Sequence, residues 1–273
     1  MNPKAFGARS RVIVAIGPAS PDPAALIAAV QLAQSAGAVL AALFVEDINL
    51  LRLAELPFAQ EIGMVSATMR RLVSADVERA LKRQADELRR ALAETAHAVR
   101  LEWTFGTVRG RPARVLLEAA GEGDFVVLAS TAVRTLTHAT LAGAVRSALR
   151  ATLQGAKPRR TRTMAAVLQP GPSALRVLVA AQQLAQSSAA DLMLILAGPQ
   201  DAEFLAMVKA WLGERVVAAR VTPLPGLAPA QVAQLAADED ISAMFWPGDG
   251  VEDIEPEVEA LLEAISCPLV VVC

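Results

Sequence analysis

The pentapeptide Gln31-Leu32-Ala33-Gln34-Ser35 occurs a second time in this chain, as Gln183-Leu184-Ala185-Gln186-Ser187. The two copies are 152 residues apart, and at this offset residues 11–44 align with residues 163–196 without a gap. Eleven of these 34 pairs are identical, including Pro18 over Pro170. Similarity at a fixed offset indicates a duplicated unit. We therefore expect two copies of one fold within the 273 residues.

The residues around the pentapeptide predict the order of elements. Each copy opens with a short apolar run, residues 11–16 and residues 164–168, typical of a strand covered on both faces of a parallel sheet. In the first copy Asp22-Pro23 supplies an N-cap and a first-turn proline, and Gly37 supplies a helix stop. Residues 39–45 follow as a second buried strand. Strand, helix and strand in this order begin a doubly wound sheet.

The later parts of the copies also match, as a third strand, a helix and a fourth strand. In the first copy the third strand contains Trp103 and Phe105, the helix starts at Gly110-Arg111-Pro112-Ala113, and the fourth strand is residues 124–129. In the second copy the corresponding segments are residues 216–221, 226–237 and 241–246. We expect an α/β fold with two doubly wound, mainly parallel sheets, five-stranded in the second copy and four- or five-stranded in the first. The expected domains are residues 1–156 and residues 157–273.

The first copy carries an insert of about 35 extra residues, within residues 46–97, between its second and third strands. Apolar residues recur at helical spacing in residues 66–97, which predicts an amphipathic helix. These residues are Val73, Val77, Leu81, Leu88 and Leu92. Residues 50–58 are too apolar for an ordinary surface loop. We expect this segment to cover a crevice or to meet a protein partner.

The two copies end differently. The second copy closes with a helix over residues 256–265 and an apolar strand over residues 267–273. The first copy has the matching helix, residues 141–153, and then the basic stretch 155–162, in which no apolar fifth strand is visible. We expect this stretch to be a solvated linker, and contact with nucleic acid or an anionic surface is the alternative. A terminal strand at a sheet edge invites pairing with another strand. We therefore expect either a homodimer or a pseudo-dimer within one chain.

The composition excludes several classes of protein. A net charge of −2 is a poor electrostatic footprint for a nucleic-acid binder. The sequence before residue 12 lacks the apolar core of a signal peptide, and no apolar run approaches the roughly 20 residues of a membrane span. The two cysteines, Cys267 and Cys273, frame neither a disulfide scaffold nor a zinc site. We expect a cytoplasmic protein without a nucleic-acid or membrane partner.

In this order, these elements resemble a tandem universal stress protein. The matching motifs are Gly110-Arg111-Pro112-Ala113, Val126-Val127-Leu128, Gly143-Ala144-Val145 and the closing Cys267-Pro268-Leu269-Val270-Val271-Val272, and the likeness covers nearly the whole chain outside the insert. The resemblance implies a strand order of 3-2-1-4-5. In the ATP-binding branch of that family it also implies a nucleotide across the carboxyl ends of strands 1 and 4. Strand order reverses between these strands, and ligands bind at such points in doubly wound sheets.

The phosphate-binding motif of that branch is degraded in this chain. The ATP-binding members carry Gly-x2-Gly-x9-Gly-[Ser/Thr] after strand 4, where glycines let backbone amides approach phosphates. Ala129 and Ala132 stand at the first two glycine positions, and Ile16 stands where the family tends to carry an Asp. The resemblance therefore implies an adenine-nucleotide crevice that is altered or lost.

Some groups at this crevice remain able to bind a ligand. The residues that the resemblance places there are Gly17, Pro18, Val45, Ser130, Thr131, Arg134 and Gly143. Their hydroxyl and guanidinium groups, with Arg109 and Arg111 at the same sheet edge, are able to hold a phosphate or carboxylate without the glycines. This set of residues does not by itself require a cofactor. The candidate ligand is ATP, AMP or another small anion.

In the second copy the matching loop, residues 247–255, has four acidic residues and repels phosphate. Two interpretations of these acids stay open. They favour the N-terminus of the next helix, or Asp249, Glu252 and Asp253 hold a divalent cation.

The sequence contains no Gly-x-Ser-x-Gly elbow, Walker motif or His-Glu-x-x-His pair. The resemblance then implies a non-catalytic stress-response or regulatory protein of the universal stress type, not an enzyme. One alternative is an ATP-binding, slowly hydrolysing switch that uses Arg134. Another is a structural partner-binding module that uses residues 50–64.

Overall fold

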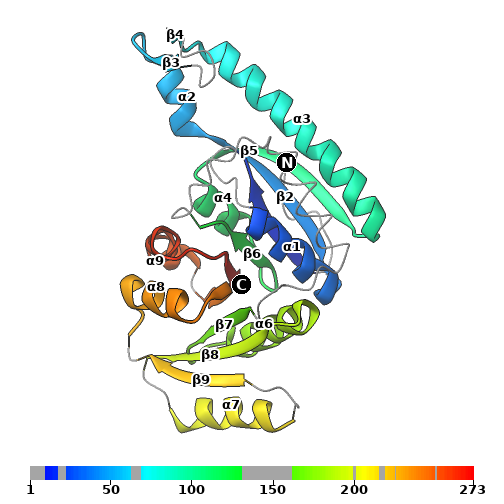
Figure 1. Ribbon diagram of the computed structural model, residues 1–273, viewed down its shortest axis with the longest axis vertical. Coiled ribbons are helices and arrows are strands. Elements are labelled where there is room, and N and C mark those ends of the chain that lie inside the picture. Colours follow the sequence, from blue (N-terminus) through cyan, green and yellow to red (C-terminus); the bar gives the residue numbers. More distant parts are fainter. Residues whose placement is uncertain are drawn as a thin grey trace.

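The computed structural model describes residues 10–17, 23–62, 69–130, 162–198, 201–214, 219–224, 226–249 and 251–273. Within these ranges nine strands form one sheet, with helices on both of its faces (Figure 1). A separate two-stranded sheet lies in the insert. The predicted fold class, α/β with mainly parallel, doubly wound strands, is confirmed.

Four strands of the large sheet come from the first half of the chain, residues 10–130. Their order is β5 (Trp103–Gly110), β2 (Val39–Asp47), β1 (Arg11–Ile16) and β6 (Phe125–Leu128), and all four are parallel. In order along the chain they are strands 3, 2, 1 and 4 of a doubly wound sheet. Val12, Ile13 and Val14 are each at most 1% exposed, because helices cover both faces of β1.

The second half, residues 162–273, supplies five strands in the mirrored order. They are β11 (Leu269–Val272), β10 (Ile241–Pro247), β7 (Thr163–Leu168), β8 (Asp191–Ala197) and β9 (Ala219–Leu224). Parallel pairing connects all five. Numbered along this half, the order is 5-4-1-2-3.

The two halves meet where β11 pairs with β6 in antiparallel register, from Leu269 opposite Leu128 to Val272 opposite Phe125. The backbone N–H of Cys273 donates to the carbonyl of Asp124 at 3.0 Å and extends this ladder. The sequence analysis expected two separate sheets, and this join makes them one. The last strand therefore lies inside the sheet, because β6 has no neighbour from its own half on that side and offers its backbone groups to β11.

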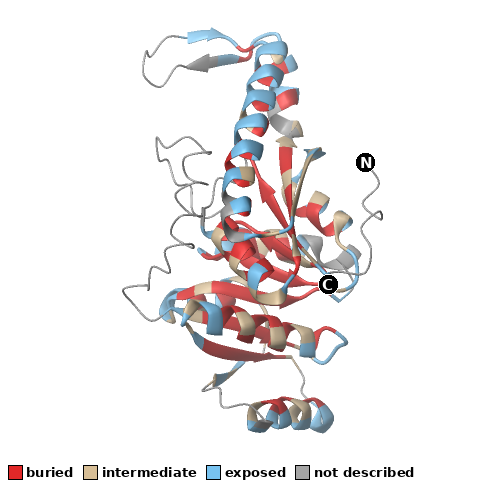
Figure 2. Ribbon diagram, turned by 90° about the vertical axis from the view of Figure 1, so that its right-hand side faces the viewer, coloured by how far each residue is buried: buried red, intermediate tan, exposed pale blue. Residues whose placement is uncertain are grey.

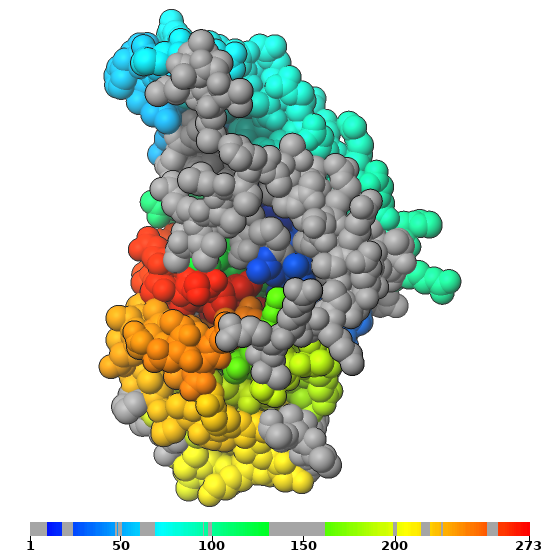
Figure 3. All heavy atoms as spheres, viewed as in Figure 1, coloured from blue at the N-terminus to red at the C-terminus, as the bar shows by residue number. Residues whose placement is uncertain are grey.

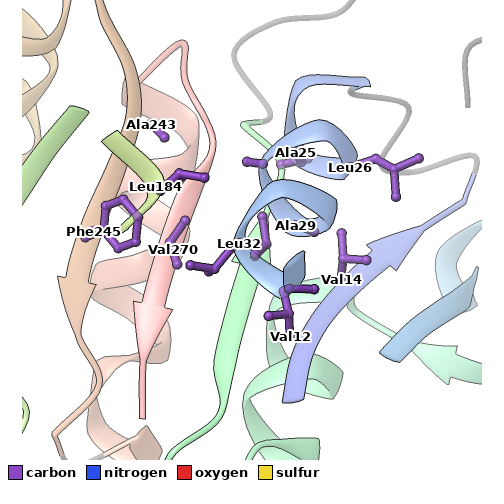
Figure 4. Close-up of a cluster of buried hydrophobic side chains, with 14 of the residues drawn as sticks. Val12, Val14, Ala25, Leu26, Ala29, Leu32, Leu184, Ala243, Phe245 and Val270 are labelled. Atoms are coloured by element: carbon purple, nitrogen blue, oxygen red, sulfur yellow. The ribbon is translucent and has the colours of Figure 1, made fainter. Parts of the chain in front are cut away.

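One face of the sheet is covered by α1 (Pro23–Ala36), α3 (Ser74–Val99), α6 (Ala174–Ser188) and α7 (Ala202–Glu214). The other face is covered by α4 (Pro112–Ala119), α8 (Pro229–Asp238) and α9 (Val251–Ala264). Each hydrophobic core runs through both halves. Figure 4 shows Leu32 of α1 in the same cluster as Leu184 of α6 and Val270 of β11. The Ser188 hydroxyl also donates to Gln31 Oε1 at 3.2 Å, so α1 and α6 bond to each other at the pentapeptide.

Gly37 ends α1 at φ +62°, as the sequence predicts, because a left-handed residue at this position suits glycine. Other boundaries shift slightly. The predicted strand 216–221 is found as β9, and the last helix begins at Val251 with Pro256 inside it. The predicted helix 141–153 lies outside the described residues, as does the linker 155–162 except for its last residue.

The insert lies between β2 and β5, as predicted, and projects beyond the large sheet (Figure 1). It contains α2 (Ile48–Glu55), the antiparallel strands β3 (Gln60–Ile62) and β4 (Met69–Arg71), and α3. The sequence analysis expected one helix over residues 66–97, but residues 69–71 form β4 and the helix begins only at Ser74. Val73 is consequently 43% exposed just before α3, whereas Leu88 and Leu92 are buried against the sheet.

Candidate functional site

The first candidate site lies at the carboxyl end of β1, which has β2 as its neighbour on one side and β6 on the other. This is the topological switch point of the first half. Gly17 approaches the end of β2 so closely that an added Cβ would lie 2.9 Å from the Val45 carbonyl oxygen. The structure therefore brings together two of the predicted site residues. The Val45 side chain is only 1% exposed and belongs to the core on the α4 side of the sheet.

The floor of this switch point is apolar. β1 and β6 pair from Val12 opposite Phe125 to Val14 opposite Val127, and two further steps place Ile16 beside Ala129. Both side chains are buried in the core, with exposures of 3% and 8%. Neither side chain accepts a hydrogen bond, so the described floor offers a ribose or an adenine no side-chain partner.

Ser130, a predicted ligand-binding residue, makes its hydrogen bonds to the second half. Its side chain is 5% exposed. The hydroxyl donates to the carbonyl oxygens of Leu262 and Ile265, at the C-terminal end of α9. Helix ends leave such carbonyls without helical partners, so Ser130 supplies part of the α9 cap. The remaining predicted site residues, Pro18, Thr131, Arg134 and Gly143, lie outside the described residues.

The two arginines expected at the sheet edge both meet acidic residues of the same chain. Arg109 Nη2 lies 3.1 Å from Glu46 Oε2 and 3.9 Å from Glu78 Oε1. Arg111 Nη1 lies 3.8 Å from Glu259 Oε1 of α9, which again connects the two halves. These guanidinium groups therefore already have anionic partners. A ligand phosphate would have to compete with the glutamate carboxylates for them.

A groove of about 470 Å³ lies beside Arg109, between α3 and β5. Its charged lining residues are Glu46, Glu78, Asp86, Lys82, Arg89 and Arg109. Three acids and three bases cancel, so this groove has no net charge that would select a phosphate or a cation.

The switch point of the second half lies between the carboxyl ends of β7 and β10. The loop after β10 carries Asp249, and its Oδ2 accepts a hydrogen bond from the hydroxyl of Ser173 at 2.7 Å. The same Oδ2 is 3.4 Å from the backbone nitrogen of Ser173, the residue before α6. An added Cβ on Gly171 would lie 2.5 Å from this oxygen, so the carboxylate fills the space beside the glycine.

Asp249 thus occupies a position where an anion would bind, at the N-terminal end of α6. The sequence analysis missed this contact. It assigned Asp249 to the N-terminus of the following helix, α9, or to a cation, because no local signal connects residue 249 with residue 173. Among the described residues, no group of three His, Cys, Asp or Glu side chains is placed to hold a metal ion.

Cys273 lies near Asp249 and is buried. Burial raises the pKa of its thiol from the ordinary value of 9.0 to about 11, and the negative charges of Asp124 and Asp249 act in the same direction while Arg176 opposes them. The thiol is therefore protonated at neutral pH. A thiolate is the nucleophilic form, so this cysteine is chemically inert under those conditions.

Comparison with known proteins gives a likeness in fold. No protein-family profile and no curated protein matches the sequence. A universal stress protein from Archaeoglobus fulgidus is 12% identical with a TM-score of 0.51, over 95% of each chain. A putative universal stress protein from Pseudomonas aeruginosa is 14% identical with a TM-score of 0.47, over 97% of this chain and 93% of that one.

Another Pseudomonas aeruginosa structure, of a protein described as functionally unknown, is 12% identical with a TM-score of 0.49, over 97% of this chain and 92% of that one. In the part of the chain that the structure describes, no helix has the length and apolarity needed to cross a bilayer. With its doubly wound strand order and its likeness to the Archaeoglobus structure over nearly all of both chains, this chain has the fold of the universal stress proteins.

Proposed function

We propose that this chain is a non-catalytic, cytoplasmic regulatory protein of the universal stress type, in which two fused copies of the unit have altered or lost their adenine-nucleotide crevices. The repeated pentapeptide and the mirrored strand orders of the two halves support the duplication. The antiparallel β6–β11 join makes the chain a pseudo-dimer in this proposal, because each half supplies a strand to a shared sheet.

The observation that carries this proposal is that the described residues at both switch points offer a nucleotide no free side-chain partner. In the first half, Ile16 and Ala129 form an apolar floor and the Ser130 hydroxyl bonds to α9. In the second half, the Asp249 carboxylate stands at the N-terminal end of α6. A bound triphosphate would have to displace a carboxylate in one half and to do without side-chain partners from the floor in the other.

Isothermal titration calorimetry with ATP, ADP and AMP tests this proposal. We expect no saturable binding at micromolar concentrations. Thermal unfolding in 5 mM nucleotide is an independent measurement, because a ligand bound with micromolar affinity would stabilise the fold by several kcal/mol. Micromolar ATP binding would overturn the proposal and support the nucleotide switch. The affinity of Arg134→Ala for ATP would then show whether Arg134 holds the phosphates.

A second candidate function, a module that binds a protein partner through the insert, is supported by the exposed apolar side chains there. Leu53, Phe58 and Met69 are 48%, 75% and 65% exposed. The predicted contact segment, residues 50–64, also contains Leu51 and Ala54, which are buried in the core. Deleting the segment would therefore damage the fold, and point substitutions of exposed residues are the sharper test of binding.

A further inference from the structure

We propose that two copies of this chain associate through the edge strand β5 and the flank of α3 beside it, in a two-fold symmetric dimer. The flank consists of Glu78, Lys82, Asp86 and Arg89, four charged residues of α3 that line the groove against β5, and it is called the charged stripe below. The association goes beyond the proposed function, because it adds a contact between chains at the edge of the sheet farthest from the second half.

β5 is an outermost strand of the sheet and has a free backbone edge. The backbone N–H of Leu40 in β2 donates to the Glu102 carbonyl at 3.0 Å, and the register sets Leu40 opposite Trp103. In a parallel pair with this register, the even-numbered residues of β5 bond to β2, and the odd-numbered residues from Trp103 to Arg109 direct their N–H and C=O groups outward. Within the described residues, β2 is the only strand that pairs with β5. An unpaired edge of this kind is a template for another strand.

The other strands offer less for pairing between chains. β9, at the opposite edge, has six residues and contains Pro223, which has no backbone N–H to donate. β11 is paired on both sides, by β6 and β10. β5 has eight residues and no proline, so it presents the longer edge and a full set of donors.

The groove beside this edge presents charged groups that a second chain can reach. All four residues of the charged stripe are exposed. Glu78 lies 3.9 Å from Arg109, and in the part of the chain that the structure describes Lys82, Asp86 and Arg89 take part in no ion pair. Figure 2 views the molecule from the α3 side and shows exposed residues along the length of this helix. In Figure 3 α3 lies along the upper right margin and α7 at the bottom, so a second copy can approach α3 without meeting the second half.

The order of charges in the stripe identifies a second copy as the partner. Along α3 the stripe alternates as acid, base, acid and base. When a second α3 runs antiparallel beside the first, Glu78 lies opposite Arg89 of the second copy, and Lys82 lies opposite Asp86 of the second copy. The midpoint of 78 and 89 is 83.5, and that of 82 and 86 is 84, so one two-fold axis brings all four residues to opposite charges.

The same axis passes the middle of β5. Residue 84 is six residues beyond Glu78, which is about 9 Å along a helix. A strand covers that length in about three residues. Because α3 and β5 run in opposite directions (Figure 1) and Glu78 lies beside Arg109, the axis passes near Gly106. Antiparallel β5 strands with this centre set Phe105 opposite Thr107 of the second copy, and the backbone groups of both residues point outward.

Sedimentation equilibrium of the full chain over a range of concentrations tests the proposal. We expect a reversible dimer that weakens as the salt concentration rises. Lys82→Glu should raise the dissociation constant at least about tenfold, because it sets a glutamate against Asp86 of the second copy at two symmetric places. Arg83→Glu is the matched control, since Arg83 is exposed on α3 outside the groove, and it should leave the dissociation constant nearly unchanged.

Mixing two variants tests the two-fold arrangement itself. Asp86→Lys should weaken the dimer as Lys82→Glu does, because it sets two lysines against each other. A mixture of the two variants should associate nearly as strongly as the wild type, because every facing pair in the mixed dimer then has opposite charges. Weakening by each variant without recovery in the mixture would contradict the pairing of Lys82 with Asp86.

A proline at Thr107 tests the strand contact separately. The N–H of Thr107 points outward, so Thr107→Pro removes a donor of the free edge and no bond to β2. We expect the dimer to be lost. Thr107→Val keeps the N–H and should keep the dimer. Circular dichroism checks that each variant is folded.

A wild-type chain that stays monomeric at all concentrations would overturn the proposal, and so would a dimer that Lys82→Glu or Thr107→Pro leaves intact. A monomer that binds another protein through the charged stripe would likewise exclude the second copy as the partner. None of these results changes the nucleotide titrations, because the two switch points lie at β1 with β6 and at β7 with β10. The self-association and the proposed function therefore fail separately.

Discussion

At the scale of single residues, polar side chains of the type that often binds ligands make hydrogen bonds within the chain. Ser130 and Asp249 both lie in loops after a switch-point strand, where hydroxyls and carboxylates often bind ligands. Here Ser130 bonds to the end of α9 and Asp249 to Ser173 before α6. Each contact joins elements that are far apart in sequence, and each uses a polar group that a ligand would need.

The Ser130 contact predicts a measurable loss of stability. Ser130→Ala removes the donor to two carbonyl oxygens at the buried end of α9, and we expect the free energy of unfolding to fall by about 1–2 kcal/mol. Urea denaturation measures this change. Ser187→Ala is the matched control, because that hydroxyl bonds only to Leu184 within its own helix, and it should change stability by less than about 0.5 kcal/mol. Equal effects would contradict the assigned role of Ser130.

At the scale of elements, one buried ion pair fixes how β1, β6 and the loop after α4 fit together. Arg11 Nε lies 3.0 Å from Asp124 Oδ2, and the Arg11 backbone N–H donates to Oδ1 at 2.9 Å. The backbone N–H of Gly121 donates to Oδ2 at 2.9 Å. Asp124 is 4% exposed, so all these partners surround one desolvated carboxylate at the amino end of β6.

Removing this carboxylate should be strongly destabilising. In Asp124→Ala the Arg11 guanidinium loses its anionic partner while it stays largely buried, and we expect a loss of about 3–5 kcal/mol in chemical denaturation. Asp76→Ala breaks the ion pair with Arg79 on α3, whose side chains are 62% and 71% exposed. That control should cost less than about 1 kcal/mol. A small effect of Asp124→Ala would show that the pair contributes little to the fit of these elements.

At the scale of the whole molecule, the two halves share a sheet and both cores. The β6–β11 ladder, the Ser188–Gln31 hydrogen bond and the Arg111–Glu259 ion pair all cross between them. Neither half is complete alone, because β6 would expose an unpaired edge of apolar residues and α9 would lose the Ser130 donor.

We therefore expect the full chain to unfold in one cooperative transition. Differential scanning calorimetry should give a calorimetric enthalpy equal to the van't Hoff enthalpy, because opening either half removes packing from the other. Two resolved transitions, or a calorimetric enthalpy near twice the van't Hoff value, would show instead that the halves unfold independently. Measurement at several protein concentrations separates this unfolding from any dissociation of a dimer.

The sequence alone determined the α/β class, the order of the strands of the large sheet and of most helices between them, and the place of the insert; α2, α7 and the β3–β4 pair were not predicted. Apolar runs such as residues 11–16 and stops such as Gly37 are local signals, and local geometry is enough to interpret them. The identical pentapeptides lie in α1 and α6, the helices that follow β1 and β7. The apolar floor at Ile16 and Ala129 was visible too, because it depends on which residues stand at the ends of two recognisable strands.

Only the tertiary structure decided how these elements combine. It placed β11 beside β6, turned Ser130 toward α9, set Asp249 against Ser173 and paired residues 60–62 with residues 69–71. Strand pairing and polar contacts between distant segments depend on which backbone and side-chain groups remain unsatisfied after the local elements have formed. Which groups remain unsatisfied depends on the whole folded chain, so no local sequence pattern predicts these contacts.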